Sequence, residues 1–341
     1  MLNFESDYTQ GAHPEILNKL FETNFEHLTS YGLDKYSDYA KNKIKALCNK
    51  EDAQVFLLSG GTQTNQIVID TMLHSTEGII CADSGHINVH EAGAIEFSGH
   101  KTISIENDEG KIYAKDVGAI IKAFYADESH THCVYPGMVY ISHPTEYGTL
   151  YTKKELEELA GVCRKNNIPL YLDGARLGYG LMSSDTDVTI EDIAEFCDVF
   201  YIGGTKVGAL CGEAVVFTHG NTPKRFFTSI KQHGALLAKG RLLGIQFYTL
   251  FKDDLYFRVS EHANKMADKI RQALEDKNYE IFIKTSTNQI FVVLCEENIE
   301  RLKKHIAFTI WEHLFEDLYV VRLATSWATT ESDINELIKI L

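Results

Sequence analysis

The feature that most constrains this chain is an alternation of short apolar runs with amphipathic helical stretches before about residue 220. Seven of the runs have the length and the β-branched or aromatic content of strands. They are Val55–Ser59, Ile79–Ala82, Lys101–Ile105, Met138–Ser142, Pro169–Asp173, Val199–Gly203 and Glu213–Thr218. Helical patterns lie between several of them, including Thr64–Leu73, Val117–Tyr125 and Lys153–Asn166. This alternation predicts an α/β fold with a seven-stranded, mainly parallel sheet covered on both faces.

The pattern changes after Gly220, where longer helical stretches and a few further β-rich segments follow. The helical stretches are Lys224–Phe251 and Leu255–Lys277, and the β-rich segments are Glu280–Lys284, Gln289–Cys295 and Tyr319–Ala324, with a helix between the last two. This composition predicts a smaller α+β unit. We therefore expect two domains, residues 1–250 with an N-terminal arm and residues 251–341.

Charge and cysteine usage limit the partners and the compartment. A net charge of −15 repels nucleic acids and anionic membranes, so neither is an expected partner. The first residues lack the basic and apolar regions of a signal peptide, and no apolar run is long enough to span a bilayer. The seven cysteines are scattered and odd in number, which is typical of buried thiols in a reducing compartment. We expect a cytoplasmic protein.

Because ligands of open α/β sheets bind beyond the carboxyl ends of the strands, the residues that follow each strand are the candidate site residues. The first predicted strand runs into Gly60, Gly61 and Thr62, just before a helix. The glycines allow close backbone approach, and the free N–H groups of a helix start bind phosphate. The alternative is a glycine turn with a threonine cap, since the segment lacks the Gly-Lys-Ser/Thr ending of a nucleotide P-loop.

Two later strands end at an acid and at a lysine. Asp173 closes an apolar strand, where a carboxylate needs a cationic partner such as the protonated pyridine nitrogen of pyridoxal phosphate. An ion pair with Arg176 is the alternative partner. Lys206 follows the next strand, and partial burial there would let it act as a nucleophile rather than as a surface lysine. One strand–helix–strand step separates Asp173 from Lys206, so both side chains can flank one ring.

His86 and Glu146 follow two other strands and belong to the same predicted edge of the sheet. Each could be no more than a loop residue whose hydrogen bonds are satisfied locally. Their conjunction with the glycine turn, Asp173 and Lys206 is more specific than any one of these signals. It indicates a site for pyridoxal phosphate.

These residues resemble the low-specificity L-threonine aldolases, which belong with the β-eliminating lyases to the fold-type-I pyridoxal-phosphate enzymes. The similar stretches extend from Ser6-Asp7 nearly to the end of the chain. They are Ser59–Asn65, Gly85-His86 with Glu91–Gly93, Asp173–Leu177, Gly203–Lys206 and Val321–Thr325. The resemblance implies a fold-type-I, transferase-like architecture and aldol cleavage of L-threonine or L-allo-threonine to glycine and acetaldehyde.

The resemblance also implies how the cofactor would be held. Lys206 would form the Schiff base, Asp173 would pair with the pyridine nitrogen, and His86 would stack on the ring. The cofactor phosphate would bind to the backbone N–H groups of Gly61 and Thr62 and to the Thr205 hydroxyl.

For the substrate, the resemblance implies that Arg176 and Arg322, helped by Ser6, clamp the carboxylate in a bidentate manner. It implies a homotetramer, built as a dimer of dimers, whose active sites are shared across an interface. The positive groups that would reach the neighbour's phosphate are Lys231 together with Lys239 or Arg241.

The chain departs from the family pattern at one loop. Typical threonine aldolases have a histidine in an Asn-Thr-His-Asn-Gly loop, where this chain has Pro144–Gly148 with Glu146. The histidine-like position near the C-terminus is Ser326-Trp327. The base that removes the β-hydroxyl proton would then be Glu146, His86 or a bound water, and its pKa should lie near the working pH.

Three alternatives remain open at this point. Two are other reactions of the same cofactor, β-elimination and transamination, against which the Asp-Gly-Ala-Arg-Leu sequence favours the aldolase. The third is a scaffold that binds pyridoxal phosphate without turnover. The His130–Cys133 segment has metal-binding residue types, but it is interpreted as a polar loop before a strand, so no metal is expected.

Overall fold

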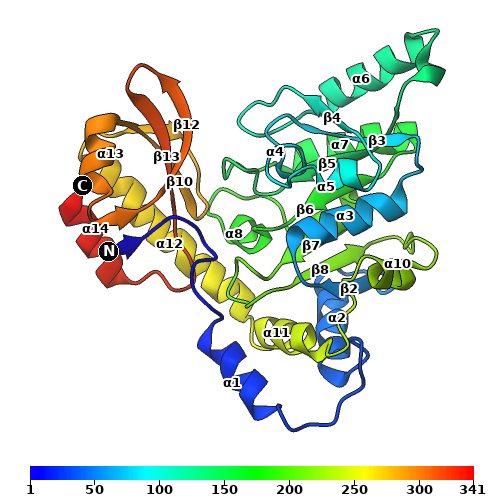
Figure 1. The fold of residues 1–341 in the computed structure, drawn as a ribbon, viewed down its shortest axis with the longest axis horizontal. Helices are drawn as coiled ribbons and strands as arrows, with labels where there is room; N and C mark the ends of the chain where they lie inside the picture. The colour runs from blue at the N-terminus through cyan, green and yellow to red at the C-terminus, as the bar shows by residue number, and fades with distance from the viewer.

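A computed structural model describes residues 1–341 and shows a large α/β unit beside a smaller unit (Figure 1). The large unit contains a seven-stranded sheet in the order β2-β8-β7-β6-β5-β3-β4. The strands are β2 (Gln54–Leu58), β3 (Glu77–Ala82), β4 (Thr102–Ile105), β5 (Tyr135–Ser142), β6 (Leu170–Asp173), β7 (Val199–Gly203) and β8 (Glu213–Phe217). Only β8 runs in the opposite direction to the other strands, and it is antiparallel to both of its neighbours, β2 and β7. The predicted seven-stranded, mainly parallel sheet is confirmed.

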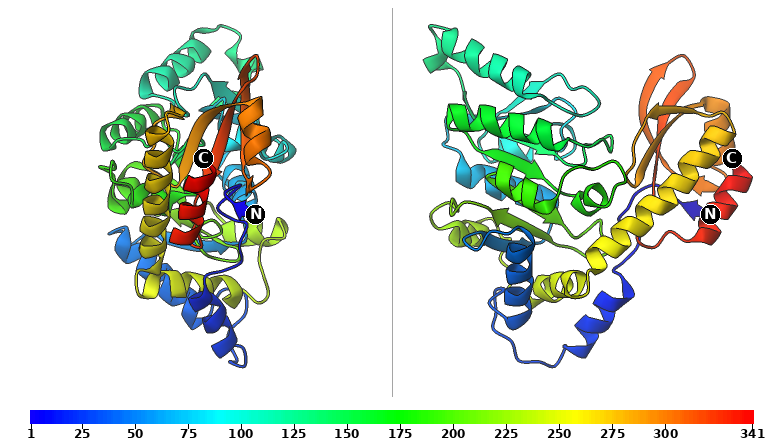
Figure 2. Two further views of the ribbon diagram at one scale, coloured as in Figure 1. Left: turned by 90° about the vertical axis from the view of Figure 1, so that its left-hand side faces the viewer. Right: turned by 180° about the vertical axis from the view of Figure 1, so that it is seen from behind.

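Helices cover both faces of this sheet (Figures 1 and 2). The longer ones are α2 (Lys35–Leu47), α3 (Gly61–Met72), α6 (Ala114–Ala126), α7 (Lys153–Asn166), α9 (Ile190–Phe196), α10 (Phe226–Gln232) and α11 (Arg241–Lys252). Shorter ones are α4 (His86–Val89), α5 (Ala94–Phe97) and α8 (Leu177–Leu181). No helix of the structure combines the length and apolarity needed to cross a membrane.

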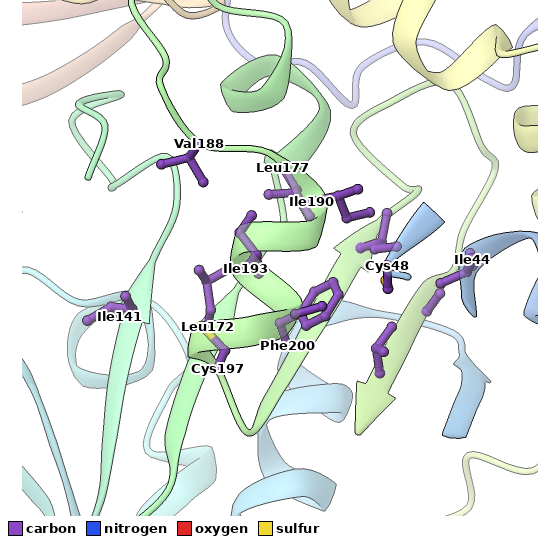
Figure 3. Close-up of a cluster of buried hydrophobic side chains, with 14 of the residues drawn as sticks. Ile44, Cys48, Ile141, Leu172, Leu177, Val188, Ile190, Ile193, Cys197 and Phe200 are labelled. Carbon is purple, nitrogen blue, oxygen red and sulfur yellow. The ribbon is translucent and has the colours of Figure 1, made fainter. Parts of the chain in front are cut away.

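Two separate apolar clusters fill the two faces of the sheet, because alternate residues of each strand point to opposite sides. In β7, Val199 and Tyr201 belong to one cluster while Phe200 and Ile202 belong to the other. Figure 3 shows part of the larger cluster, with Phe200 among side chains from the neighbouring strands and helices. Burial on both faces explains why these strands are apolar throughout.

The carboxyl ends of β6 and β7 lie side by side and are held by a glycine. The backbone of Gly174 accepts a hydrogen bond from the N–H of Gly203 at 2.9 Å. A Cβ atom at Gly174 would lie 1.9 Å from the carbonyl oxygen of Tyr201, which no side chain tolerates. This close approach brings the loops after both strands to the same edge of the sheet.

The smaller unit consists of a four-stranded antiparallel sheet in the order β12-β13-β10-β9 with helices packed against it. Its strands are β9 (Glu280–Ile283), β10 (Gln289–Cys295), β12 (Thr309–Phe315) and β13 (Leu318–Ala324), and its helices are α12 (Leu255–Asp276), α13 (Glu296–Leu302) and α14 (Glu331–Ile340). Before α1 (Pro14–Glu22), strand β1 (Leu2–Asn3) pairs with β11 (Ile306–Ala307). The N-terminal segment therefore lies against the C-terminal unit.

One expectation for the second half of the chain is wrong, and another is incomplete. The helical pattern of Lys224–Phe251 is interrupted after α10, where Gly234 has a φ of 72° that ends the helix. The stretch between β10 and β13 contains β12 as well as a helix, and β12 alternates between half-buried and exposed residues at the edge of the sheet. The division at residue 250 falls within α11 and remains a prediction.

Candidate active site

A cavity of about 300 Å³ lies at the carboxyl ends of β5, β6 and β7, beside the start of α3. Eight of the predicted site residues line it: Gly61, Thr62, His86, Glu146, Asp173, Arg176, Thr205 and Lys206. A second cavity of about 550 Å³ adjoins it, shares His86, Glu146, Arg176 and Lys206, and adds Arg322. The fold thus brings nine predicted residues together.

Asp173 is buried and accepts four hydrogen bonds. The donors are Tyr201 at 2.5 Å, Tyr140 at 2.7 Å, the Ala175 N–H at 2.9 Å and Asn65 at 3.0 Å. Burial alone would raise the pKa of Asp173, but the charge of His86 and these hydrogen bonds outweigh it and lower the pKa. The carboxylate stays ionised, as a partner for a protonated pyridine nitrogen must.

Lys206 follows β7 in the loop that leads into β8, with its side chain in both cavities. Its carbonyl accepts a 2.5 Å hydrogen bond from the hydroxyl of Tyr179, which fixes the backbone. Its Nζ lies 5.8 Å from the centre of the Tyr8 ring. Burial, aided by the nearby charge of Arg176, lowers the pKa of Lys206 to about 8. An amine of this kind is partly neutral near pH 7 and therefore nucleophilic.

The start of α3 is open to an anion. Its N-cap is Gly60, which supplies no side-chain hydrogen bond, so the first N–H groups of this helix are directed at the cavity without a capping partner. A Cβ atom at Gly61 would come within 3.2 Å of the Tyr201 hydroxyl. The hydroxyl oxygen of Thr205, which is predicted to bind phosphate here, lies 2.7 Å from Oε1 of Glu213.

His86 lies at the start of α4 and is oriented by a buried acid. Its Nδ1 is 2.7 Å from Oε1 of Glu91, whose side chain is fully buried. The same Glu91 oxygen accepts a hydrogen bond from Asn65 at 2.8 Å, and Asn65 also donates to Asp173. The other oxygen of Glu91, Oε2, is buried without a partner. One network therefore links the predicted ring-stacking residue to the predicted ring-nitrogen partner.

Glu146 comes from the loop after β5 and is buried in the wall of the cavity. Its Oε1 accepts hydrogen bonds from the Ser142 hydroxyl at 2.6 Å and from the His86 N–H at 2.9 Å. Burial raises the pKa of Glu146, although the hydrogen bond from Ser142 opposes this rise. The raised pKa makes this carboxylate a stronger base than an ordinary glutamate, which is the direction that general-base catalysis requires.

Arg176 does not pair with Asp173 but with Asp7 of the N-terminal arm. Its Nε and Nη2 donate to the two oxygens of Asp7 at 2.7 and 2.9 Å. Asn288 donates to the same buried carboxylate at 2.9 Å. Because this bidentate pair uses one side of the guanidinium, Nη1 is the nitrogen left to meet a substrate. The expected bidentate clamp of Arg176 is directed at Asp7 in this structure.

Arg322 on β13 lies over the ring of Trp311, with its guanidinium carbon 5.0 Å from the ring centre. It donates to Gln289 at 3.3 Å and to the carbonyl of Glu5 at 3.1 Å, while its buried Nε has no partner. Burial and the charge of Arg176 lower the pKa of Arg322 to about 10. An unpaired buried donor on a cation is a site for an anion.

Four predicted residues lie outside both cavities, namely Ser6, Lys231, Lys239 and Arg241. Ser6 is buried, and its hydroxyl accepts from the Tyr8 N–H at 3.4 Å. Arg241 donates to the carbonyls of Glu26 and Thr23. Lys231 lies 5.0 Å above the ring of Tyr31. Their predicted roles remain predictions.

The sequence prediction missed several residues of the site. Tyr8, Glu91, Tyr201 and Glu213 all line the cavity, and Asp7 holds Arg176. Glu213 had a usable signal, because it is the one acid in an otherwise apolar strand, and a buried acid needs partners. Tyr201 and Tyr8 had none, since tyrosines are common in apolar strands and loops.

The chain is similar to known enzymes over most of its length. A family model described as β-eliminating lyase matches residues 3–297. The low specificity L-threonine aldolase of Pseudomonas aeruginosa is 28% identical over 303 residues, which cover 88% of this chain and 86% of that protein. The low specificity L-threonine aldolase of Escherichia coli is 23% identical over 291 residues, which cover 81% of this chain and 80% of that protein.

Solved structures agree with these matches. The threonine aldolase of Leishmania major superposes with a TM-score of 0.96 and 39% identity, covering 100% of this chain and 98% of that one. The histidinol-phosphate aminotransferase of Clostridium acetobutylicum has a TM-score of 0.74 and 15% identity, covering 100% and 98%, so it shares the fold alone. The predicted fold-type-I architecture is confirmed.

Proposed function

Because this chain belongs to the β-eliminating lyase family, we propose that it is a pyridoxal-phosphate-dependent aldolase that cleaves L-threonine or L-allo-threonine to glycine and acetaldehyde. The observation that carries the proposal is the placement of Asp173 and Lys206 in the wall of one cavity. One supplies an ionised carboxylate and the other an amine with a lowered pKa. The names of the similar proteins support aldol cleavage over other lyase reactions.

The donor set of the cavity fits pyridoxal phosphate. The uncapped start of α3 offers N–H groups to the phosphate, and Gly60 and Gly61 leave room for it. Asp173 would hold a protonated ring nitrogen, and His86 would contact the ring. When bound, the cofactor supplies an aldehyde for Lys206 and a ring that withdraws electrons from the bond to be broken. A carboxylate has about four lone-pair positions, so a ring N–H would take the place of one tyrosine hydroxyl on Asp173.

The substrate carboxylate is assigned to the two arginines. Arg322 offers the unpaired Nε and Arg176 offers Nη1. Both side chains line the larger cavity, so they can meet one carboxylate next to Lys206. Ser6 is assigned a supporting role through the arm that also carries Asp7.

Glu146 is assigned to remove the proton of the substrate β-hydroxyl. It lines both cavities, and its Oε2 takes no part in the hydrogen bonds from Ser142 and His86. Its raised pKa brings its basicity closer to neutral pH than that of an ordinary glutamate. This acid would replace the histidine of the typical family loop.

We also propose that the protein is a cytoplasmic homo-oligomer, a dimer of dimers with shared active sites. Phe21, Phe25 and Phe97 are 83, 90 and 88% exposed, which supports burial against another subunit. The cysteines are unpaired and four of them are buried, which supports a reducing compartment.

The test uses the purified protein with pyridoxal phosphate and L-threonine. We expect a visible absorbance band from the lysine-linked cofactor and the release of glycine and acetaldehyde in equal amounts. Lys206→Ala should abolish both, while Lys101→Ala, an exposed lysine outside the cavities, should leave both intact. Formation of a keto acid together with ammonia would indicate β-elimination instead of aldol cleavage. Formation of a keto acid without ammonia would indicate transamination. A stable band without products would identify a binding scaffold.

A further inference from the structure

Glu213 is a buried acid at the end of the cavity where a phosphate would bind, and no step of the proposed reaction uses it. Its side chain is 3% exposed, and it lines the cavity together with Gly61, Thr62 and Thr205. It reaches this edge because β8 is antiparallel, so that the first residue of β8 lies opposite Gly203 at the end of β7. An ionised carboxylate here would repel a phosphate dianion.

The hydrogen bonds around Glu213 are compatible with a neutral carboxyl group. Its Oε2 accepts from the Gly204 N–H at 3.1 Å, and its Oε1 is 2.7 Å from the Thr205 hydroxyl oxygen. That hydroxyl oxygen also accepts from the Gly212 N–H at 3.1 Å. A threonine hydroxyl has one proton and two lone pairs. If Glu213 is ionised, the proton of Thr205 is used on Glu213, and Thr205 has no donor left for a phosphate.

Protonation of Glu213 reverses this arrangement. The carboxyl proton is then donated to the Thr205 oxygen, which completes its two lone pairs together with the Gly212 N–H. The hydroxyl proton of Thr205 is released to point at the phosphate. With the phosphate bound, the carboxyl group of Glu213 and the hydroxyl of Thr205 then have partners for all their hydrogen-bond donors. A buried polar network requires such partners.

Resting on the proposed function, we propose that Glu213 holds the cofactor phosphate as a neutral carboxylic acid, acting through Thr205. The cofactor phosphate is a dianion above its second pKa of about 6, so binding to the ionised form of Glu213 requires uptake of one proton. Glu213 is thus a positioning residue for the phosphate, and it couples cofactor affinity to pH.

The surroundings of Glu213 support this protonation state. Burial raises the pKa of Glu213 to about 8 before any phosphate is present. The hydrogen bonds from Thr205 and Gly204 and the charge of Lys206 oppose the rise without cancelling it, and the charge of Asp173 adds to it. The charge of Glu213 also acts on three tyrosines, Tyr171, Tyr201 and Tyr256; burial raises the pKa of each, so they stay neutral.

The sign of the pH effect follows from this raised pKa. Below pH 8 Glu213 is mostly neutral and ready to bind the phosphate. Above pH 8 it is ionised in the free protein, and the affinity for a phosphate ligand falls by up to about tenfold per pH unit. Lys206 titrates in the same range, so its contribution must be removed from the measurement.

The experiment measures binding of 4′-deoxypyridoxine 5′-phosphate, which has no aldehyde, to Lys206→Ala and to Lys206→Ala/Glu213→Gln between pH 6.5 and 9.5. Calorimetry in buffers of different ionisation enthalpy gives the affinity and the number of protons taken up. The glutamine amide mimics the neutral acid, because its N–H can donate to Thr205 while its oxygen accepts from Gly204. Because the charge of Lys206 lowers the pKa of Glu213, its removal moves the titration of Glu213 above pH 8. We expect Lys206→Ala to lose more affinity than the double variant at the high end of this pH range, and to take up about one more proton there.

Controls separate this proposal from the proposed function. Lys206→Ala/Glu155→Gln removes an acid outside the cavity, the third residue of α7, whose side chain completes the capping box with Thr152. This variant should keep the pH dependence of Lys206→Ala. In the Lys206→Ala background, Thr205→Val should weaken binding at pH 7 by about tenfold or more, as expected for loss of a hydrogen bond to a charged group, and Thr205→Ser should restore most of it. Parallel pH profiles and equal proton uptake with and without Glu213 would overturn this inference alone. Failure of the probe to bind at any pH would overturn the proposed function as well.

Discussion

Three buried acids, Asp173, Glu146 and Glu213, share one cavity but hold their protons differently. The pKa of Asp173 is lowered because four donors and the charge of His86 outweigh burial. The pKa values of Glu146 and Glu213 are raised because burial outweighs their fewer hydrogen bonds. At the residue scale, the number of donors around each carboxylate therefore determines which acid pairs with a cation and which is poised to exchange a proton.

The first prediction concerns Glu146. If its carboxylate is the base, the cleavage rate rises as pH increases through its raised pKa, and Glu146→Gln should lower kcat by about 10²- to 10⁴-fold. Ser142→Ala removes the hydrogen bond that opposes the rise in pKa, so the rising limb should move to higher pH without being lost. Steady-state kinetics across pH measure both effects. An unchanged rising limb in Glu146→Gln would assign the base to another group.

The second prediction concerns the ion pair between Asp7 and Arg176. Asp7→Asn leaves a buried guanidinium without its counter-charge, which should cost about 3–5 kcal/mol in the free energy of unfolding and raise KM. Urea unfolding measures the loss. Glu22→Gln, which breaks the exposed pair with Lys19, should change stability by less than about 1 kcal/mol.

The same pair predicts a pH dependence. Burial raises the pKa of Asp7, but the charges of Arg176 and Lys206 and two hydrogen bonds outweigh it, so the folded-state pKa is lowered. The pair therefore stabilises the protein above the unfolded-state pKa of about 3.9, and this contribution is lost as pH falls through the lower folded-state value. The stability difference between wild type and Asp7→Asn should shrink in acid. A constant difference would mean that Asp7 acts through packing rather than charge.

At the element scale, the third prediction compares two glycines. Gly174→Ala places a Cβ atom 1.9 Å from the Tyr201 carbonyl and forces β6 and β7 apart, so we expect a loss of more than about 3 kcal/mol and weaker cofactor binding. Gly161 lies exposed within α7 with nothing near its Cβ position. Gly161→Ala should stabilise the protein by about 0.5–1 kcal/mol. Thermal unfolding measures the stability of the two variants, and cofactor absorbance measures their cofactor binding. Equal effects of the two substitutions would show that β6 and β7 do not require a glycine at position 174.

The elements also explain how much the sequence could predict. Asp173 and Lys206 were predicted because parallel strands end at one edge, so residues after successive strands converge. Glu213 was missed because it begins an antiparallel strand, whose amino end lies at that same edge. Strand β12 was missed because, at the edge of its sheet, it is not apolar throughout. Both were missed because the direction of a strand and its position in the sheet depend on its neighbours. The local sequence pattern does not show which strands these neighbours are.

At the scale of the whole molecule, residues from the two ends of the chain complete the site. β1 pairs with β11, and this places Asp7 and Tyr8 between the large sheet and the smaller unit. Arg322 comes from β13, and its guanidinium donates to the carbonyl of Glu5 in the arm. The ion pair between Asp7 and Arg176 joins residues that are 169 positions apart in the sequence. The substrate end of the site therefore forms only when both units and the arm are assembled.

The last prediction concerns the neighbouring subunit. Arg241 already donates to two carbonyls of its own chain, so Lys231 and Lys239 are the groups to remove. If they reach the neighbour's phosphate, Lys206→Ala and Lys231→Ala/Lys239→Ala should each be weakly active or inactive alone. In a mixed dimer, one site has an intact Lys206 and receives intact lysines from its partner. Mixing under conditions that exchange subunits should then restore about one quarter of wild-type activity, because half of the dimers are mixed and each has one sound site.

The control mixes Lys206→Ala with Asp173→Asn, and activity should not be restored. Lys206 and Asp173 line the same cavity of one chain, so each site of the mixed dimer lacks one of them. Mixed dimers that form without any gain in activity would show that each chain holds its phosphate unaided.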